Sequence, residues 1–327
     1  MVLRLIRLPK RNSLLILGPR GSGKSHLIRT LFGSGRRTLW IDLLRPEEEE
    51  DYLRDPALLR QRIQSRSIAR VVIDEVQKVP KLLDVAHEMI ESSRIQFIMS
   101  GSSARKLKRG SANLLAGRAL SYRLDPFTHR ELGDRFDLEE ALEFGLLPKI
   151  YFPFGPESTK PWTRAEKTAF LQTYSRTYVR EEIQIEQHVR NILPFRGFLQ
   201  VAAQMNGKLI DYSKIAEDVG VDHKTVAEYF NILEDTLLGF RLHPYHRSIR
   251  KRQGRKPKFY FFDPGVKRAL DLTLSVNLLP QTGAYGEAFE HFILLEIRKL
   301  AEIENPDIGI SFFRTRDGTQ EIDLILE

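Results

Sequence analysis

A glycine-rich segment that directly follows a short apolar run contains the residue types that hold phosphate groups. Residues 14–17 are Leu-Leu-Ile-Leu, and residues 18–25 form the pattern G-x-x-x-x-G-K-S. This pattern predicts a buried strand, a loop whose backbone N–H groups surround a polyphosphate, and a helix that begins at Lys24. Gly18, Gly21 and Gly23 allow the positive-φ and close-approach conformations that such a loop requires.

The loop predicts ATP and Mg²⁺ as cofactors. We expect Lys24 to contact the β- and γ-phosphates and the Ser25 hydroxyl to bind Mg²⁺. The residues predicted to contact the nucleotide are consecutive: Gly18, Pro19, Arg20, Gly21, Ser22, Gly23, Lys24, Ser25 and His26.

A second apolar run, about 50 residues after the loop, ends in two carboxylates. Residues 70–75 are Arg-Val-Val-Ile-Asp-Glu, as expected where a buried parallel strand ends in a nucleotide hydrolase. Asp74 is predicted to hold Mg²⁺ together with Ser25. Glu75 is predicted to orient and deprotonate the attacking water.

A third apolar run, residues 95–99, leads into Ser-Gly-Ser-Ser. Ser102 is predicted to lie between the γ-phosphate and the water. The alternative is that Ser102 or Ser103 caps a helix that begins at Ala104.

Alternating strand and helix patterns position these residues. Strands are expected at residues 14–17, 38–41, 70–74, 95–99 and 120–124, and helices at 24–32, 58–68 and 82–90. The acidic run at 47–51 is expected to be a solvated surface segment. This alternation predicts an α/β fold with an open, mostly parallel sheet.

The composition excludes several kinds of site and segment. The 327 residues are 42% apolar and include no cysteine, which excludes disulfides and thiolate metal sites and favours a cytoplasmic location. No run of 18 apolar residues occurs, so no membrane span is expected. The first ten residues lack the features of a signal peptide.

The net charge of +8 is concentrated in one stretch. Residues 241–258 contain no acidic residue and eight basic ones: Arg241, Arg247, Arg250, Lys251, Arg252, Arg255, Lys256 and Lys258. Such a local excess indicates a polyanionic partner or a solvated loop.

Residues 212–229 have the pattern of a helix-turn-helix, with Ala216 where the helices touch and Gly220 in the turn. Residues 238–242 and 258–262 are expected to form a hairpin with the basic stretch at its tip. Together they predict a winged helix that binds duplex DNA with weak sequence preference. The predicted DNA contacts are His223, Lys224, Arg247, Arg250, Lys251, Arg252, Arg255 and Lys256. The alternative is a winged helix that contacts protein.

Taken together, these residues resemble the bacterial and archaeal AAA+-type ATPases that carry a winged helix and a restriction-endonuclease-like domain. The resemblance rests on 18–25, 73–77, 99–103, 117–118, 124–127, 174–182, 231–236 and 286–290. It implies a P-loop NTPase core (1–127), a helical lid and connector (128–190), a winged helix (191–265) and a partial PD-(D/E)XK-like α/β unit (266–327). It also makes Arg118 a candidate arginine finger, which requires a homo-oligomer. The alternative for Arg118 is a surface ion pair.

In the last unit, a helix is expected at 286–300 and strands at 310–315 and 321–326. Glu290 on this helix and Asp323 on the last strand fall where the resembled family places metal-binding carboxylates. The sequence ends at Glu327, before the Glu-x-Lys that nuclease chemistry of this kind needs. We therefore expect a truncated or remnant unit without nuclease activity in this chain.

The function expected from the sequence is a Mg²⁺-dependent ATPase coupled to a DNA-binding winged helix. The alternative is a nucleotide-switched signalling ATPase whose winged helix binds protein or inhibits the ATPase core.

Overall fold

A computed structural model describes residues 3–33, 35, 37–93, 95–103, 117–155, 160–178, 192–248, 255–315 and 317–327. The chain forms two compact units. The sheet unit comprises Ile6–Asp125 with Asp235–Leu237, and the helical unit comprises Pro126–Glu234 and Leu238–Glu327 with the N-terminal residues up to Leu5.

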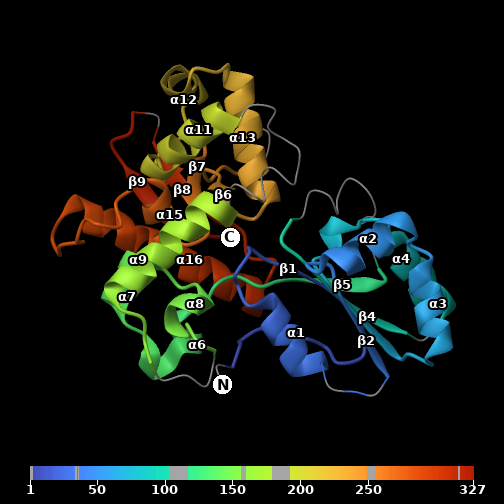
Figure 1. Ribbon diagram of the computed structural model, residues 1–327. Coiled ribbons are helices and arrows are strands. Elements are labelled where there is room, and N and C mark those ends of the chain that lie inside the picture. The colour runs from blue at the N-terminus through green and yellow to red at the C-terminus, as the bar shows by residue number, and fades with distance from the viewer. Residues whose placement is uncertain are drawn as a thin grey trace. The chain divides into compact units, whose positions relative to one another are not determined.

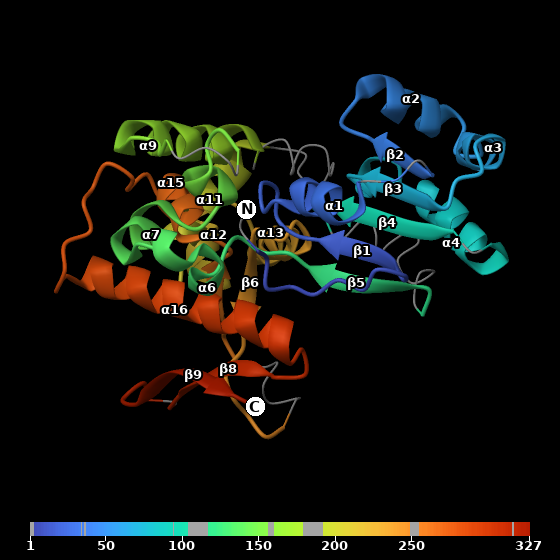
Figure 2. The ribbon, with the colours of Figure 1, turned by 90° about the horizontal axis from the view of Figure 1, so that it is seen from below.

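The sheet unit is built on five parallel strands in the order β2-β3-β4-β1-β5, which Figure 2 shows side by side. Their bounds are β1 Ser13–Leu17, β2 Thr38–Asp42, β3 Arg70–Asp74, β4 Gln96–Gly101 and β5 Ala119–Arg123. Because all five run in the same direction, their carboxyl ends share one edge of the sheet. The predicted parallel α/β sheet is confirmed.

Helices cover both faces of this sheet. They are α1 Lys24–Phe32, α2 Pro46–Arg54, α3 Leu58–Ser65 and α4 Leu82–Ser92, with a short 3₁₀ helix η1 at Val76–Lys78. Since side chains alternate along a strand, Leu14 and Ile16 pack with Ile28 of α1, whereas Leu15 belongs to the core formed with α2, α3 and α4.

One predicted surface segment has more order than the sequence pattern indicated. The acidic run at 47–51 lies in helix α2, whose first helical residue is Pro46 and whose first turn carries Glu47, Glu48 and Glu49. Proline at this position and negative charge in the first turn both favour a helix N-terminus. The run is mostly solvated, as expected, while Tyr52 is buried. The helix expected from Ala104 lies outside the described residues.

The helical unit contains most of the remaining elements (Figure 1). Its helices are α6 His129–Leu132, η2 Gly133–Arg135, α7 Leu138–Phe144, α8 Pro148–Tyr151, α9 Arg164–Thr173, the π-helix η3 Tyr174–Tyr178, α11 Ile192–Gln204, α12 Tyr212–Val219, α13 His223–Asp235, α15 Pro264–Leu270 and α16 Gly283–Glu304. Its strands are β6 Gly239–Leu242, β7 Lys258–Phe261, β8 Ile310–Arg314 and β9 Glu321–Leu326. Within the described ranges, no helix has both the length and the apolar character needed to cross a membrane.

The predicted helix pair and hairpin are present. Helix α12 ends at Gly220, which has φ 72°, and Asp222 accepts hydrogen bonds from the N–H groups of Lys224 and Thr225 at 2.8 and 3.0 Å at the start of α13. Strands β6 and β7 pair antiparallel. Helices α11, α12 and α13 share one core with the hairpin, in which Phe198, Phe230 and Phe259 are in contact.

The C-terminal segment packs on that same hairpin. Helix α16 precedes the antiparallel pair β8–β9, as the sequence predicted. The N–H of Phe312 on β8 donates to the carbonyl of His243 at 3.2 Å, and Leu242, Tyr260, Leu294 and Phe312 form a buried cluster. The hairpin and the C-terminal segment therefore share apolar core.

His291 of α16 predicts a pH-dependent stability. Its side chain is buried, its Nε2 lies 2.7 Å from the carbonyl oxygen of Phe261, and burial lowers its pKa from 6.5 to about 3. Between pH 6.5 and 3, His291 therefore binds a proton in the unfolded chain but stays neutral in the folded chain. The free energy of unfolding consequently falls as the pH falls through this range. From pH 6.5 to 5 the loss is about 2 kcal/mol for this one group. Urea unfolding at pH 7.5 and 5 measures it. His291→Gln keeps an N–H donor and should lose less stability over the same interval; an equal loss in both proteins contradicts this assignment.

Candidate active site at the end of the parallel sheet

The loop after β1 needs its glycines. Gly21 and Gly23 have φ values of 79° and 95°, in the left-handed region that favours glycine. A Cβ on Gly18 would overlap the carbonyl oxygen of Leu124 in the neighbouring strand segment. The predicted positive-φ and close-approach conformations are confirmed.

Three backbone N–H groups of this loop have no acceptor in the part of the chain that the structure describes. Among the described residues, none accepts a hydrogen bond from the N–H groups of Gly21, Gly23 or Ser25. These groups lie at the N-terminus of α1, where the helix dipole favours an anion. A polyphosphate would satisfy them, so the loop fits the predicted ligand.

The other loop residues differ in exposure. Pro19 and Ser22 are buried, Arg20 and Ser25 are half-buried, and His26 is exposed. The Lys24 side chain is buried, and its Nζ donates to the carbonyl oxygens of Gly18 at 2.8 Å and Pro19 at 3.1 Å. Because an ammonium has three N–H donors, one remains for a phosphate oxygen.

Asp74 lies at the end of β3 and is only 2% exposed. Its Oδ1 accepts a short hydrogen bond from the Ser100 hydroxyl, and the oxygen of that hydroxyl accepts from the N–H of Glu75 at 3.1 Å. Within the described chain, no donor contacts Oδ2 of Asp74. This oxygen is available to a cation.

Glu75 has unusual backbone and side-chain surroundings. Its φ of 60° and ψ of 48° place a non-glycine residue in the left-handed region, which costs roughly 1–3 kcal/mol. Its Oε2 accepts hydrogen bonds from the Gln77 amide and, at 3.1 Å, from the Ser102 hydroxyl. Gln77 Nε2 also donates to Ser102 Oγ at 2.8 Å. The three buried side chains form a closed triangle.

The order of the strands explains why these groups meet. Strand β4 lies between β1, which carries the loop, and β3, which carries Asp74. The carbonyl of Gly101 at the end of β4 accepts a hydrogen bond from the N–H of Gly18 at 3.2 Å. Ser100 thus contacts Asp74 and Glu75, Gly101 contacts the loop, and Ser102 contacts Glu75.

Sequence reasoning missed Ser100 and Gln77. Ser100 carries a hydroxyl one residue before the end of the buried strand β4, and Gln77 lies two residues after Glu75. Each was visible only as a polar residue in a buried pattern.

The structure places Arg118 in an ion pair. Its Nε donates to Glu91 Oε1 on α4 at 2.7 Å, and this hydrogen bond holds the pKa of the Glu91 carboxyl below its usual value. Both side chains are partly exposed. The surface ion pair that was one alternative is thus present, and the arginine-finger role stays a prediction.

The basic stretch is partly neutralised within the helical unit. Arg241 pairs with Glu234, Lys256 pairs with Asp211 at 2.6 Å, and Lys258 contacts several carboxylates. Arg247 and Arg255 form no ion pair with any described residue, and His223 and Lys224 are exposed at the start of α13. The predicted contacts Arg250, Lys251 and Arg252 lie outside the described residues.

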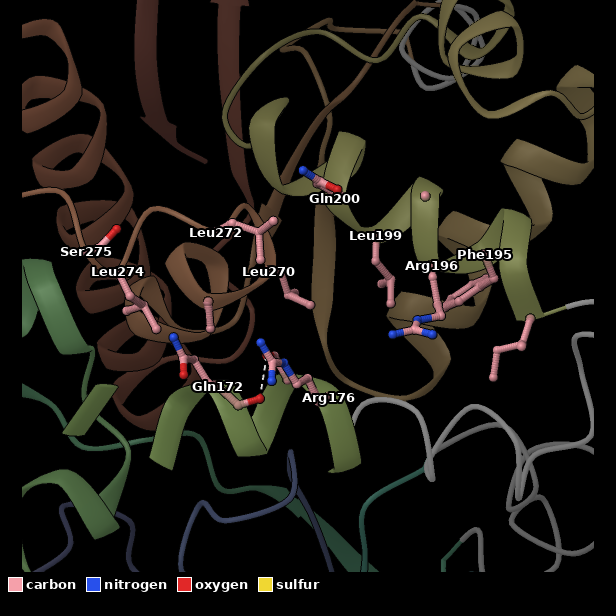
Figure 3. Close-up of a pocket in the computed structure, with 14 residues that line it drawn as sticks. Gln172, Arg176, Phe195, Arg196, Leu199, Gln200, Leu270, Leu272, Leu274 and Ser275 are labelled. Carbon is pink, nitrogen blue, oxygen red and sulfur yellow. Dashed lines mark hydrogen bonds between the residues drawn. The ribbon is translucent and has the colours of Figure 1, made fainter. Parts of the chain in front are cut away.

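A cavity of about 590 Å³ lies within the helical unit and contains none of the predicted site residues. Figure 3 shows Arg176 and Arg196 among the residues that line it. Phe195, Leu199, Leu270, Leu272 and Leu274 supply apolar lining. The described lining residues include no carboxylate.

Two different family models match two consecutive parts of the chain. Residues 10–133 match the model of a family described as an AAA domain. Residues 135–277 match a family described as a domain of unknown function, DUF8612. The first match covers the segment with this phosphate loop and parallel sheet, so residues 10–133 are similar to AAA domains.

Longer similarities cover most of the chain. An uncharacterized protein of Mycobacterium tuberculosis and one of Mycobacterium bovis are each 28% identical over 322 residues, which covers 96% of this chain and 67% of each relative. An uncharacterized protein of Haemophilus influenzae is 23% identical over 303 residues, covering 86% of this chain and 73% of the relative. The structure of the Aeropyrum pernix ORC2 protein (ADPNP-ADP complexes) is similar with 13% identity and a TM-score of 0.39, covering 81% of this chain and 87% of that one.

Ser100→Ala tests the contribution of the β4 end to stability. The change leaves the buried N–H of Glu75 without its acceptor, which costs about 1–3 kcal/mol. Urea unfolding of the nucleotide-free protein measures the loss. Ser92→Ala is the matched control, because its exposed hydroxyl bonds only the carbonyl of Glu88 in the preceding turn. Equal stabilities of the two variants would rule out the assigned role of Ser100.

Proposed function

We propose that the protein binds ATP with Mg²⁺ and hydrolyses it, and that hydrolysis is coupled to a DNA-binding winged helix. The observation that carries the ATPase proposal is the set of hydrogen bonds that joins the phosphate loop, Asp74 and Glu75 through residues 100–102. These bonds hold a phosphate-binding element and two carboxylates in one buried assembly.

The loop residues would bind the triphosphate. The N–H groups of Gly21, Gly23 and Ser25, which have no acceptor among the described residues, and the third donor of Lys24 would contact phosphate oxygens. The Ser25 hydroxyl and Asp74 Oδ2 fit a Mg²⁺ site, and the ion would neutralise charge on the phosphates.

Glu75 would act as the base. Its Oε1 accepts no hydrogen bond from any described residue, while Oε2 is held by Gln77 and Ser102. The oxygen of a water bonded to Oε1 would attack the γ-phosphorus, the bond from that phosphorus to the bridging oxygen would break, and the water proton would pass to Glu75. ADP and phosphate are the products. Ser102 would orient Glu75.

DNA is the proposed partner of the helix pair α12–α13 and the β6–β7 hairpin. The support is the exposure of His223 and Lys224 on α13 and of Arg247 beside the hairpin. Neither Arg247 nor the half-buried Arg255 forms an ion pair with any described residue. Phosphate contacts dominate such a surface, so we propose binding to duplex DNA with weak sequence preference. A cytoplasmic homo-oligomer, with Arg118 as arginine finger, remains part of this proposal.

A second candidate is a nucleotide-switched signalling ATPase whose winged helix binds protein or inhibits the ATPase core. The ion pairs of Arg241, Lys256 and Lys258 favour it, because they reduce the charge that the hairpin can offer to DNA. Slow turnover that does not change when duplex DNA is added would select this candidate.

Glu75→Gln separates binding from hydrolysis. Loss of the base should lower phosphate release by roughly 10²–10⁴-fold and leave binding of a fluorescent ATP analogue intact. Lys24→Ala should abolish binding as well, since it removes the buried ammonium of the loop. Glu47→Gln on the exposed face of α2 is the charge-matched control. Wild-type protein that is folded, binds no ATP with Mg²⁺ and releases no phosphate contradicts the ATPase proposal.

Salt dependence tests the DNA proposal. With about half of the basic stretch on phosphates, the affinity for duplex DNA should fall with a log-log salt slope of roughly −3 to −4. Arg255→Ser should make the slope about one unit shallower. Arg130→Ser removes the same charge from an exposed ion pair with Glu304 and should leave the slope unchanged. Fluorescence anisotropy between 50 and 200 mM salt measures the slopes. No binding at low salt eliminates DNA as the partner without affecting the ATPase proposal.

A further inference from the structure

A buried ammonium lies among three carboxylates in the helical unit. Lys258 is the first residue of β7, and its side chain is only 5% exposed. Its Nζ is 2.7 Å from Glu321 Oε1, 3.4 Å from Asp323 Oδ1 and 3.7 Å from Glu290 Oε1. The ring centroid of Phe312 lies 5.3 Å from the same nitrogen.

The carboxylates come from elements distant in sequence from Lys258. Glu290 is on α16, whereas Glu321 and Asp323 are two residues apart on β9 and therefore point to the same face of the strand. Tyr260, two residues after Lys258 on β7, donates its hydroxyl hydrogen to Glu290 Oε1 at 2.7 Å. Two side chains of the hairpin thus contact the C-terminal segment through charged or polar groups.

The three carboxylates provide acceptors and negative charge for the buried Lys258 ammonium. Burying an ammonium is strongly unfavourable unless acceptors replace its water. Lys258 has three N–H donors, and three carboxylates surround it. Only one of the three distances is that of a strong hydrogen bond, so the ammonium lies between the carboxylates and interacts with all of them by charge.

The same carboxylates do not fit a metal. The resemblance to restriction-endonuclease-like domains implies a divalent ion between Glu290 and Asp323, but the Lys258 ammonium lies there and Tyr260 already donates to Glu290 Oε1. In the part of the chain that the structure describes, no group of three or more His, Cys, Asp or Glu side chains has the arrangement of a metal site.

We propose that Lys258 is the resident cation of this cluster. Its ammonium balances the carboxylates together with the Arg314 guanidinium, which lies 3.2 Å from Glu321 Oε2. It excludes divalent ions from Glu290 and Asp323 and joins the base of the β6–β7 hairpin to α16 and β9. Lys258 therefore does not contact DNA phosphates, and the hairpin cannot separate from the C-terminal segment without breaking these ion pairs and exposing the buried ammonium. Removing the ammonium would let Glu290, Glu321 and Asp323 close around a divalent cation, an arrangement that these carboxylates do not have with Lys258 in place.

Binding of Mn²⁺ tests the proposal. Free Mn²⁺ is followed by electron paramagnetic resonance in nucleotide-free protein that carries Asp74→Asn, so that the ATPase site contributes no signal. In this background, adding Asp323→Asn should leave Mn²⁺ binding unchanged. Replacing Lys258 with Met should add one bound Mn²⁺ per chain, and combining Lys258→Met with Asp323→Asn should remove it. Lys258→Arg, which keeps the positive charge, should bind no additional Mn²⁺.

Two results overturn the proposal. One is a Mn²⁺ site in the protein with Lys258 intact that Asp323→Asn or Glu290→Gln abolishes. The other is a Lys258→Met protein, folded by circular dichroism, that gains no Mn²⁺. Should Lys258→Met fail to fold, the comparison of Asp323→Asn with its parent decides alone, since it requires no change at Lys258.

Discussion

Three consecutive residues at the end of β4 hold the glycine-rich loop, Asp74 and Glu75 together. The Gly101 carbonyl bonds the loop, the Ser100 hydroxyl bonds Asp74 and the N–H of Glu75, and the Ser102 hydroxyl bonds the Glu75 carboxylate. All three residues are buried, so water cannot replace a lost partner. The loop and the carboxylates therefore cannot shift independently of β4, whose neighbours on both sides are parallel strands.

Glu75 combines this rigidity with strain. Its left-handed backbone is stable only because the surrounding bonds impose it, and Ser100 supplies one of them. In the closed triangle, Gln77 and Ser102 donate to Glu75 Oε2, and no described residue donates to Glu75 Oε1. A residue held in this way is positioned before any ligand arrives, which reduces the reorganisation that catalysis would require.

Short-range pattern was enough to predict the loop, the strands of the parallel sheet, the helix pair and the C-terminal helix with its two strands. Short-range pattern was not enough to predict side-chain interactions between segments that are distant in sequence. Ser100 and Gln77 gain their partners only when β3 and β4 lie side by side. The pairing of Lys258 with Asp323 spans 65 positions, so counting charges in one stretch overestimated the charge that the hairpin presents. Helix α2 was missed because a dense acidic run resembles a coil unless its position after a helix-starting proline is considered.

The shared core between the hairpin and the C-terminal segment has a consequence for how this architecture is inherited. Leu242 and Tyr260 are buried against Leu294 and Phe312, and β8 pairs with the backbone that follows β6. A gene fusion or deletion with its junction between β7 and α16 would expose this apolar surface to solvent and to aggregation. We therefore expect evolution to keep or delete one unit that comprises the helix pair, its hairpin, α16, β8 and β9.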